Sequence, residues 1–312
     1  MTFSVLRFPA RDYPAAMSAP WSQISLVGVG LLGGSIGLAA RQRGLAARVK
    51  GFVRRAPAVA ECEQSGAVDK AETDLLRAVE GADLVILCTP IAQMAELMAT
   101  MLPALKKGTI VTDVGSVKSS VVADLEPLAA AGGVHFIGSH PMAGAERMGV
   151  GAARADLFER AMCVVTPTPA SDKTAVQRLE TFWRDLGGVP LILPPELHDD
   201  LVSRSSHLPH VVAAELANYV LSPVHPREQA MLCATGFRDT TRIASGSPEM
   251  WRDICMANRK NLSRVLGVFI EDLQEFQHAL ENGDVKSIDE FFSKAKERRD
   301  GWFAKGASPS PE

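Results

Sequence analysis

Short apolar runs alternate with longer helical patterns from Gln23 to about Leu193. The runs, most of which lack polar alternation, are ISLVGV (24–29), VKGFV (49–53), LVILC (84–88), TIVTDV (109–114), HFIG (135–138), MCVVT (162–166) and VPLIL (189–193). Apolar runs of this length are typical of parallel strands that are covered on both faces of a sheet. Helical stretches lie between several of them, and one, SIGLAARQRG, ends at Gly44, a common helix-capping residue. The pattern predicts a doubly wound α/β domain with a mainly parallel sheet.

The pattern changes after Pro194 and Pro195, since hardly a strand candidate follows and apolar residues recur at helical spacing. Residues 248–283 are predicted to form one long helix, or two that meet near Gly267. Their apolar positions cover more than one face, which favours burial against a second chain; burial within one all-α domain is the alternative. We therefore expect a flexible tail over 1–21, an α/β domain over 22–194, an all-helical dimerisation domain over 195–303 and a tail over 304–312.

The stretch VGVGLLGGSIG places Gly28, Gly30 and Gly33 in G-x-G-x-x-G spacing between a predicted strand and a predicted helix. In a Rossmann domain the first glycine makes a tight turn, the second lets the backbone approach a pyrophosphate, and the third lets helix and strand pack closely. The pattern predicts a nicotinamide dinucleotide site; a Rossmann-like domain without a ligand is the alternative. Further residues expected at this site are Leu31, Leu32, Cys88, Thr89 and Pro90.

The position that distinguishes NAD from NADP carries no acid. About twenty residues after the glycine pattern an Asp or Glu usually accepts a hydrogen bond from the ribose 2′-hydroxyl. Here Val53 stands at that place, followed by Arg54 and Arg55. Because guanidinium groups bind phosphate in a bidentate manner, we favour NADP over NAD. The alternative is that the two arginines form a solvated strand end.

GSHPMAGAE (138–146) contains a histidine after an apolar run, with small residues on either side. We consider three roles for His140: a catalytic base, a hydrogen-bonded core residue and a metal ligand. No Cys or carboxylate cluster supplies further ligands at a recognisable spacing, so no metal is expected. TDVGSVKSS (112–120) is not a P-loop, because Val117 replaces the glycine before the lysine. It is interpreted as a loop that presents Ser116 to the nicotinamide and substrate.

The motifs VGVGLLGGSIG, LCTP, TDVGSVK, GSHPMAGAE, SHLPH and GFRDTTRIASGSPEMWRDI occur in this order along the chain. Together they resemble the prephenate and arogenate dehydrogenases of tyrosine biosynthesis, over roughly Ile24 to Phe303. The resemblance implies a Rossmann domain followed by an all-helical dimerisation domain. It also implies an oxidation in which a nicotinamide cofactor takes a hydride from a cyclohexadienol while the ring carboxylate leaves as CO₂.

The resemblance assigns roles to five residues. His140 matches the catalytic histidine, and a neutral imidazole suits proton abstraction near neutral pH. Ser116 matches a serine that hydrogen-bonds substrate and cofactor, and His207 a histidine of the substrate pocket. Arg242 matches the arginine that holds the ring carboxylate, and Glu146 an acid at the pocket mouth that can pair with it. The departure from relatives that use NAD lies at Val53.

Alternatives remain open. The sequence does not decide between prephenate and arogenate as substrate. A β-hydroxyacid dehydrogenase would use a catalytic lysine in its helical region, and a non-catalytic, dinucleotide-sensing dimer would not require His140, Ser116 and Arg242 together. The net charge of -3, without a long basic run, argues against nucleic acid or a membrane surface as partner. Five scattered cysteines and an N-terminus unlike a signal peptide favour free thiols and a cytoplasmic location.

Overall fold

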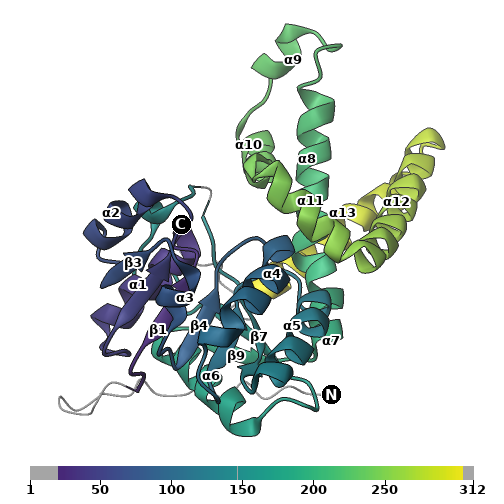
Figure 1. Ribbon diagram of the computed structural model, residues 1–312. Coiled ribbons are helices and arrows are strands. Elements are labelled where there is room, and N and C mark those ends of the chain that lie inside the picture. Colours follow the sequence, from purple (N-terminus) through teal and green to yellow (C-terminus); the bar gives the residue numbers. More distant parts are fainter. Residues whose placement is uncertain (1–19, 146, 305–312) are drawn as a thin grey trace.

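The computed structural model describes residues 20–145 and 147–304, and its central element is a six-stranded parallel sheet. The strand order is β3-β2-β1-β4-β5-β6, the order of a dinucleotide-binding doubly wound sheet (Figure 1). The strands are β1 (Ile24–Val27), β2 (Val49–Phe52), β3 (Lys70–Glu72), β4 (Leu84–Leu87), β5 (Ile110–Asp113) and β6 (His135–Phe136). The predicted fold class is confirmed. Strand β3 was not predicted, because its three residues, KAE, carry no apolar run.

Helices cover both faces of this sheet. They are α1 (Leu31–Gln42), α2 (Ala56–Gln64), α3 (Leu75–Val79), α4 (Ile91–Met101), α5 (Ser119–Gly132) and α6 (Lys173–Asp185). Successive residues of β4 belong to different cores: Ile86 packs with residues of α1 and α6, whereas Leu87 packs with residues of α4 and α5. A strand buried on both faces is mostly apolar, which is why β1 and β4 show no polar alternation. The one polar residue, Ser25 in β1, donates a hydrogen bond to the Ala78 carbonyl oxygen.

The run HFIG does not form one strand as predicted. The chain leaves the large sheet after Phe136, bends at Ile137 and enters a second sheet as β7 (Gly138–Pro141). In this sheet β7 is antiparallel to β8 (Met162–Thr166), which is parallel to β9 (Val189–Ile192). The expectation that VPLIL is covered on both faces is wrong, because β9 is an edge strand whose Val189 is 47% exposed.

From Pro195 to Ala304 the described chain consists of helices joined by short connections. They are α7 (Pro195–Val202), a π-helical turn (Ser203–His207), α8 (Leu208–Val220), α9 (Arg227–Met231), α10 (Thr235–Thr241), a 3-10 turn (Arg242–Ser245), α11 (Pro248–Ala257), α12 (Arg259–Glu281) and α13 (Val285–Ala304). The predicted helix pair in 248–283 meets at Asn258, not near Gly267, which lies inside α12.

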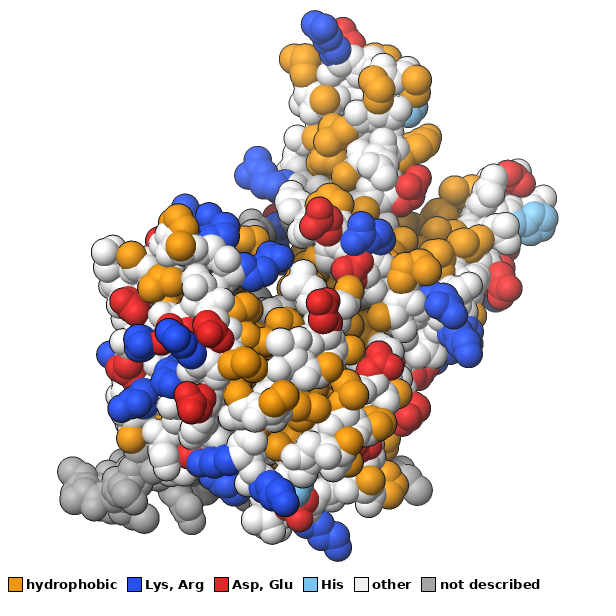
Figure 2. Space-filling model, in the orientation of Figure 1, with side chains coloured by type: hydrophobic (Ala, Val, Ile, Leu, Met, Phe, Trp, Pro, Cys, Tyr) orange, Lys and Arg blue, Asp and Glu red, His pale blue; other side chains and the backbone are white. Residues whose placement is uncertain are grey.

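Two arms extend from the α/β part of the molecule. One is built on α8 and carries α9 at its tip, and the other consists of α12 and α13 (Figure 1). Apolar side chains lie on the surface of both arms (Figure 2). None of the described helices combines the length and the apolar character needed to cross a membrane. All five cysteines are free, although only Cys62 and Cys163 are fully buried.

Candidate active site

The glycine-rich turn after β1 packs directly against the end of β4. Gly28 has a φ of +98°, and a Cβ added there would lie 2.9 Å from the carbonyl oxygen of Cys88. A Cβ on Gly33 would lie 2.1 Å from the carbonyl oxygen of Gly28. Gly30, in contrast, has no atom within 4 Å of such a Cβ. Two glycines therefore allow close packing, whereas the third leaves open space at the start of α1.

This open space suits the pyrophosphate of a dinucleotide. Leu31 and Leu32 begin α1, and the first N–H groups of a helix have no partner within it. No side chain caps this helix at Gly30. Unpaired N–H groups and the positive end of the helix dipole together attract an anion. The residues present therefore fit a dinucleotide at this turn.

The neighbouring strand ends supply the rest of this region. Thr89 follows β4, and its buried hydroxyl oxygen has no hydrogen-bond partner; Pro90 caps α4. Arg54 and Arg55 are exposed in the connection that follows β2, whereas Val53 is buried. Since the strands are parallel, their carboxyl ends meet at one edge of the sheet. The predicted cofactor residues all belong to this edge.

The last residue of β5 holds the histidine-bearing strand β7 against this same edge. Asp113 accepts a hydrogen bond from the Ser139 backbone N–H at 3.1 Å through Oδ1, and it forms an ion pair with Lys118 through Oδ2. Lys118 Nζ also donates to the Ser139 carbonyl oxygen at 2.8 Å, and both charged side chains are fully buried. A buried pair that is completed by backbone hydrogen bonds is costly to break, so it fixes β7 relative to β5.

His140 is the next residue along β7, and only 8% of it is exposed. Its Nδ1 lies 2.9 Å from Nε2 of His198. Burial, followed by the electrostatic effect of His198, holds the pKa of His140 well below its ordinary value. The imidazole is therefore neutral at pH 7, as a general base requires. Ser116, half-buried in the connection between β5 and α5, belongs to the same edge of the sheet.

His207 comes to this site from the helical part of the chain. It ends the π-helical turn between α7 and α8, a feature that is frequent at functional sites. Its Nδ1 lies 3.1 Å from the amide nitrogen of Asn258, and the Ser116 backbone lies within hydrogen-bonding range of the buried ring. Burial lowers the pKa of His207 to about 4. The ring of His207 thus lies beside the loop that carries Ser116.

Arg242 lies farther out than the two histidines. It is exposed at the start of the 3-10 turn and lowers the pKa of His210, after the larger effect of burial. The His210 ring in turn lies on Trp251, with 3.8 Å between ring centroids, and Trp251 meets His207 edge-on. The predicted pocket acid, Glu146, lies outside the described residues. His140, Ser116 and His207 are thus brought together, with Arg242 behind His210.

Sequence reasoning missed two buried residues of this site. His198 and Asp199 lie in α7, each 1% exposed, and they form a hydrogen-bonded chain with His140. The sequence assigned His198 no role, because it is 58 residues from His140 and stands in no motif. The one feature of the sequence that could have indicated them is the adjacent His-Asp pair in the first helix after the α/β part. Such a pair does not by itself show that His140 is the residue it contacts.

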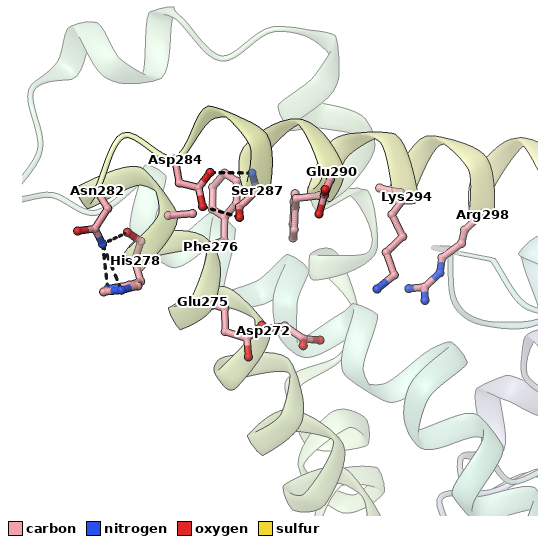
Figure 3. A pocket seen from close by; sticks show the side chains of 13 residues that line it. Asp272, Glu275, Phe276, His278, Asn282, Asp284, Ser287, Glu290, Lys294 and Arg298 are labelled. Carbon is pink, nitrogen blue, oxygen red and sulfur yellow. Dashed lines mark hydrogen bonds between the residues drawn. The ribbon is translucent and has the colours of Figure 1, made fainter.

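A separate cavity of about 570 Å³ lies between α12 and α13. Figure 3 shows the carboxylates of Asp272, Glu275 and Glu290 and the cations of Lys294 and Arg298 around it. The lining comes from these two helices and their connection alone, so none of the candidate catalytic residues borders it. This cavity belongs to the arm formed by α12 and α13 and is not the candidate active site.

Comparison with known proteins agrees with this architecture. Residues 36–192 match the family model "Prephenate dehydrogenase, nucleotide-binding domain", and residues 194–294 match "Prephenate dehydrogenase, dimerization domain". A prephenate dehydrogenase of Bacillus subtilis is 34% identical over 92% of this chain and 78% of its own length.

Solved structures show the same likeness. The A. aeolicus prephenate dehydrogenase in complex with hydroxyphenyl propionate and NAD+ superposes with a TM-score of 0.84 at 30% identity, covering 90% of this chain and 98% of that one. A Synechocystis arogenate dehydrogenase gives a TM-score of 0.76 at 29% identity, covering 90% and 99%. With both family models matched in order along one chain, the protein belongs to the prephenate dehydrogenase family of NAD(P)-dependent dehydrogenases.

Proposed function

We propose that this enzyme oxidises prephenate to 4-hydroxyphenylpyruvate and CO₂, the step that leads to tyrosine. The observation that carries the proposal is the neutral, buried His140 at the edge of the sheet where the glycine-rich turn and Ser116 also lie. A base beside a dinucleotide site is what alcohol oxidation needs. When bound, the dinucleotide accepts the hydride from the ring carbon that carries the hydroxyl group.

The residues take separate roles in this reaction. His140 removes the hydroxyl proton, Ser116 hydrogen-bonds the substrate near the cofactor, and His207 contacts the substrate in the pocket. Arg242 holds the ring carboxylate until it leaves as CO₂, because a planar guanidinium orients a carboxylate in one plane. For Glu146 we propose the role of the acid that opposes Arg242 and helps to loosen this grip. We assign residues 22–194 to cofactor binding and 195–303 to substrate binding and dimerisation.

For the cofactor we propose NADP rather than NAD. No carboxylate follows β2 to accept from a ribose 2′-hydroxyl, and the exposed guanidinium groups of Arg54 and Arg55 follow β2 instead. Two guanidinium groups are suited to a 2′-phosphate.

The second candidate is the same reaction on arogenate, which carries an ammonium group where prephenate has a keto group. The similarity to the Synechocystis arogenate dehydrogenase favours this candidate. Both reactions use the same base and the same hydride transfer, so the residues that contact the side chain must distinguish the two substrates. We further propose that two copies associate through the helical arms and, given five free thiols, that the enzyme works in the cytoplasm.

The test is a kinetic assay of the purified enzyme with prephenate or arogenate, each combined with NAD or NADP. We expect nicotinamide reduction and CO₂ release to be fastest with prephenate and NADP. Faster turnover with arogenate would select the second candidate, and the absence of turnover in all four mixtures would reject both.

The cofactor proposal has its own test. Replacing Arg54 and Arg55 together by alanine should raise the Kd for NADP about tenfold or more, since each charge-assisted hydrogen bond contributes roughly 1.5–3 kcal/mol. The Kd for NAD should change little, which provides the internal control. Equal losses for the two dinucleotides would reject a 2′-phosphate contact.

A further inference from the structure

A buried chain of hydrogen bonds runs from His140 into α7. His140 Nδ1 lies 2.9 Å from His198 Nε2, and His198 Nδ1 lies 2.8 Å from Asp199 Oδ1. The two rings meet edge-on, with 5.2 Å between their centroids. Because Asp199 is next to His198 in the sequence, one helix supplies both the ring and the carboxylate that accompany His140.

We propose that His198 and Asp199 are positioning residues that hold His140 in the tautomer with a bare Nε2, the nitrogen that takes the substrate proton. This inference rests on the proposed function, and it adds to that function a specific protonation state and the two residues that impose it.

The direction of each hydrogen bond follows from the charge of Asp199. Burial by itself would raise the pKa of this carboxyl, but hydrogen bonds from His198 and from the Lys118 and Ser119 backbone hold it below its ordinary value. An ionised carboxylate only accepts, so His198 Nδ1 carries a proton. In a neutral ring His198 Nε2 then accepts, and His140 must donate from Nδ1. The lone pair of His140 is therefore left on Nε2.

Asp199 is itself held rigidly. Its Oδ1 accepts from the Lys118 backbone N–H at 2.7 Å, and its Oδ2 accepts from that of Ser119 at 2.9 Å, at the start of α5. The Asn258 amide donates to the Asp199 carbonyl oxygen at 2.8 Å and reaches His207 as well. Asp199 thus connects the start of α5, the junction of α11 and α12, and His198, so that His140 is oriented before substrate arrives.

The hydrogen bonds that lead from His140 to Asp199 also stabilise the protonated form of His140 that arises during the reaction. When His140 accepts the hydroxyl proton it becomes an imidazolium, and its Nδ1–H still donates to His198. The negative charge of Asp199, one ring farther away, stabilises this cation, as the carboxylate of a serine-hydrolase triad does for its histidine. Asp199 need not become protonated in this step.

Two substitutions test the proposal through kcat. In Asp199→Asn, the side-chain amide N–H₂, turned toward His198, would donate to His198 Nδ1. His198 would then donate from Nε2 to His140 Nδ1, so that the proton of the neutral His140 ring lies on Nε2. We expect kcat to fall by roughly 10²–10⁴, the usual contribution of a general base, with KM changed less than about threefold. His198→Leu should lower kcat similarly, whereas His198→Gln should recover part of it, because a glutamine amide can both donate and accept.

Asp199 also accepts from the Ser119 backbone N–H at the start of α5, so a matched control must separate its effect on His140 from the capping of a helix. Asp172 caps α6 by accepting from the Ala175 backbone N–H at 2.8 Å, but α6 lies outside the site. Asp172→Asn should leave kcat unchanged. A fall in kcat for Asp199→Asn no larger than for Asp172→Asn would overturn the proposal.

The second readout does not depend on turnover. In ¹⁵N-histidine-labelled enzyme without substrate, the His140 signal, identified by its loss in His140→Asn, should report a protonated Nδ1 and a bare Nε2. A protonated Nε2 in the wild-type enzyme would overturn the proposal even if Asp199→Asn did not fold. A bare Nε2 with no turnover on either substrate would instead reject the proposed function and leave the tautomer assignment standing.

Discussion

His140 is almost fully buried, yet it lies on β7, which Asp113 holds beside the end of β5, at the edge of the sheet where the residues that fit a dinucleotide lie. Burial disfavours the imidazolium form and so lowers the pKa of the ring. A general base gains from this shift, because it stays unprotonated at a pH where an exposed histidine would be half charged.

Replacing His140 by asparagine should lower kcat by roughly 10²–10⁴, since the proton acceptor is removed while the pocket shape is largely kept. Stopped-flow or steady-state measurement of nicotinamide reduction gives kcat, and titration with the dinucleotide provides the control, because its Kd should not change. An unaltered kcat would exclude His140 as the base.

The pH profile of the wild-type enzyme makes a related prediction. Since the pKa of His140 lies below 6.5, kcat/KM, which reports the free enzyme, should remain level as pH falls through 6.5. Activity should decline only at more acidic pH, when the ring takes up a proton. An acidic limb centred at or above pH 6.5 would show that the ring is not held neutral by its surroundings.

At the scale of elements, the strand-to-helix turn after β1 shows why three glycines have different functions. Gly28 and Gly33 are required by packing, because an added Cβ would meet backbone atoms at 2.9 Å and 2.1 Å. Gly30 faces open space, since no atom lies within 4 Å of an added Cβ. Its role must therefore concern a bound molecule and not the fold.

This difference gives a matched pair of variants. Gly33→Ala should lower the melting temperature and abolish dinucleotide binding, because the backbone of the turn must move. Gly30→Ala should keep the wild-type melting temperature but weaken dinucleotide binding at least tenfold, since its methyl group occupies the open space. Thermal denaturation and equilibrium titration measure the two effects. A stable Gly30→Ala with unchanged Kd would move the pyrophosphate away from this turn.

The elements also show where sequence patterns stop being informative. Strands β1, β4 and β5 were predicted from short, mainly apolar runs without regular polar alternation, and they form the buried centre of the sheet. The division of HFIG between two sheets and the helix boundary at Asn258 were not predicted. Both depend on distant partners: β7 pairs with β8 in the second sheet, and the Asn258 amide donates to the Asp199 carbonyl oxygen.

At the scale of the whole molecule, both helical arms carry large apolar side chains that are exposed to solvent. Near the tip of the α8 arm, Met231 is 82% and Leu232 83% exposed, and on α13 Phe292 is 59% exposed. Exposed apolar patches of this kind mark interaction surfaces. The match of residues 194–294 to a dimerization-domain model agrees with this interpretation.

Changing Met231 and Leu232 together to glutamate should therefore weaken the dimer, because both charges would have to be buried at the interface. Sedimentation equilibrium should show monomers at concentrations where we expect the wild-type chain to form the proposed dimer. Leu76→Glu provides the control, since Leu76 is an exposed apolar residue of α3 in the α/β part. Dissociation by Leu76→Glu alone would place the interface elsewhere.

The sequence alone determined the parallel α/β architecture, the transition to helices after Pro194 and the glycine-rich turn, because each depends on the local periodicity or spacing of nearby residues. Only the tertiary structure decided which polar residues surround His140. His198, Asp199 and Lys118 reach it through contacts between distant parts of the chain, and their hydrogen bonds form only when β5, β7 and α7 pack together. The protonation state of the base depends on that packing, since burial and hydrogen-bond direction do not exist before the chain folds.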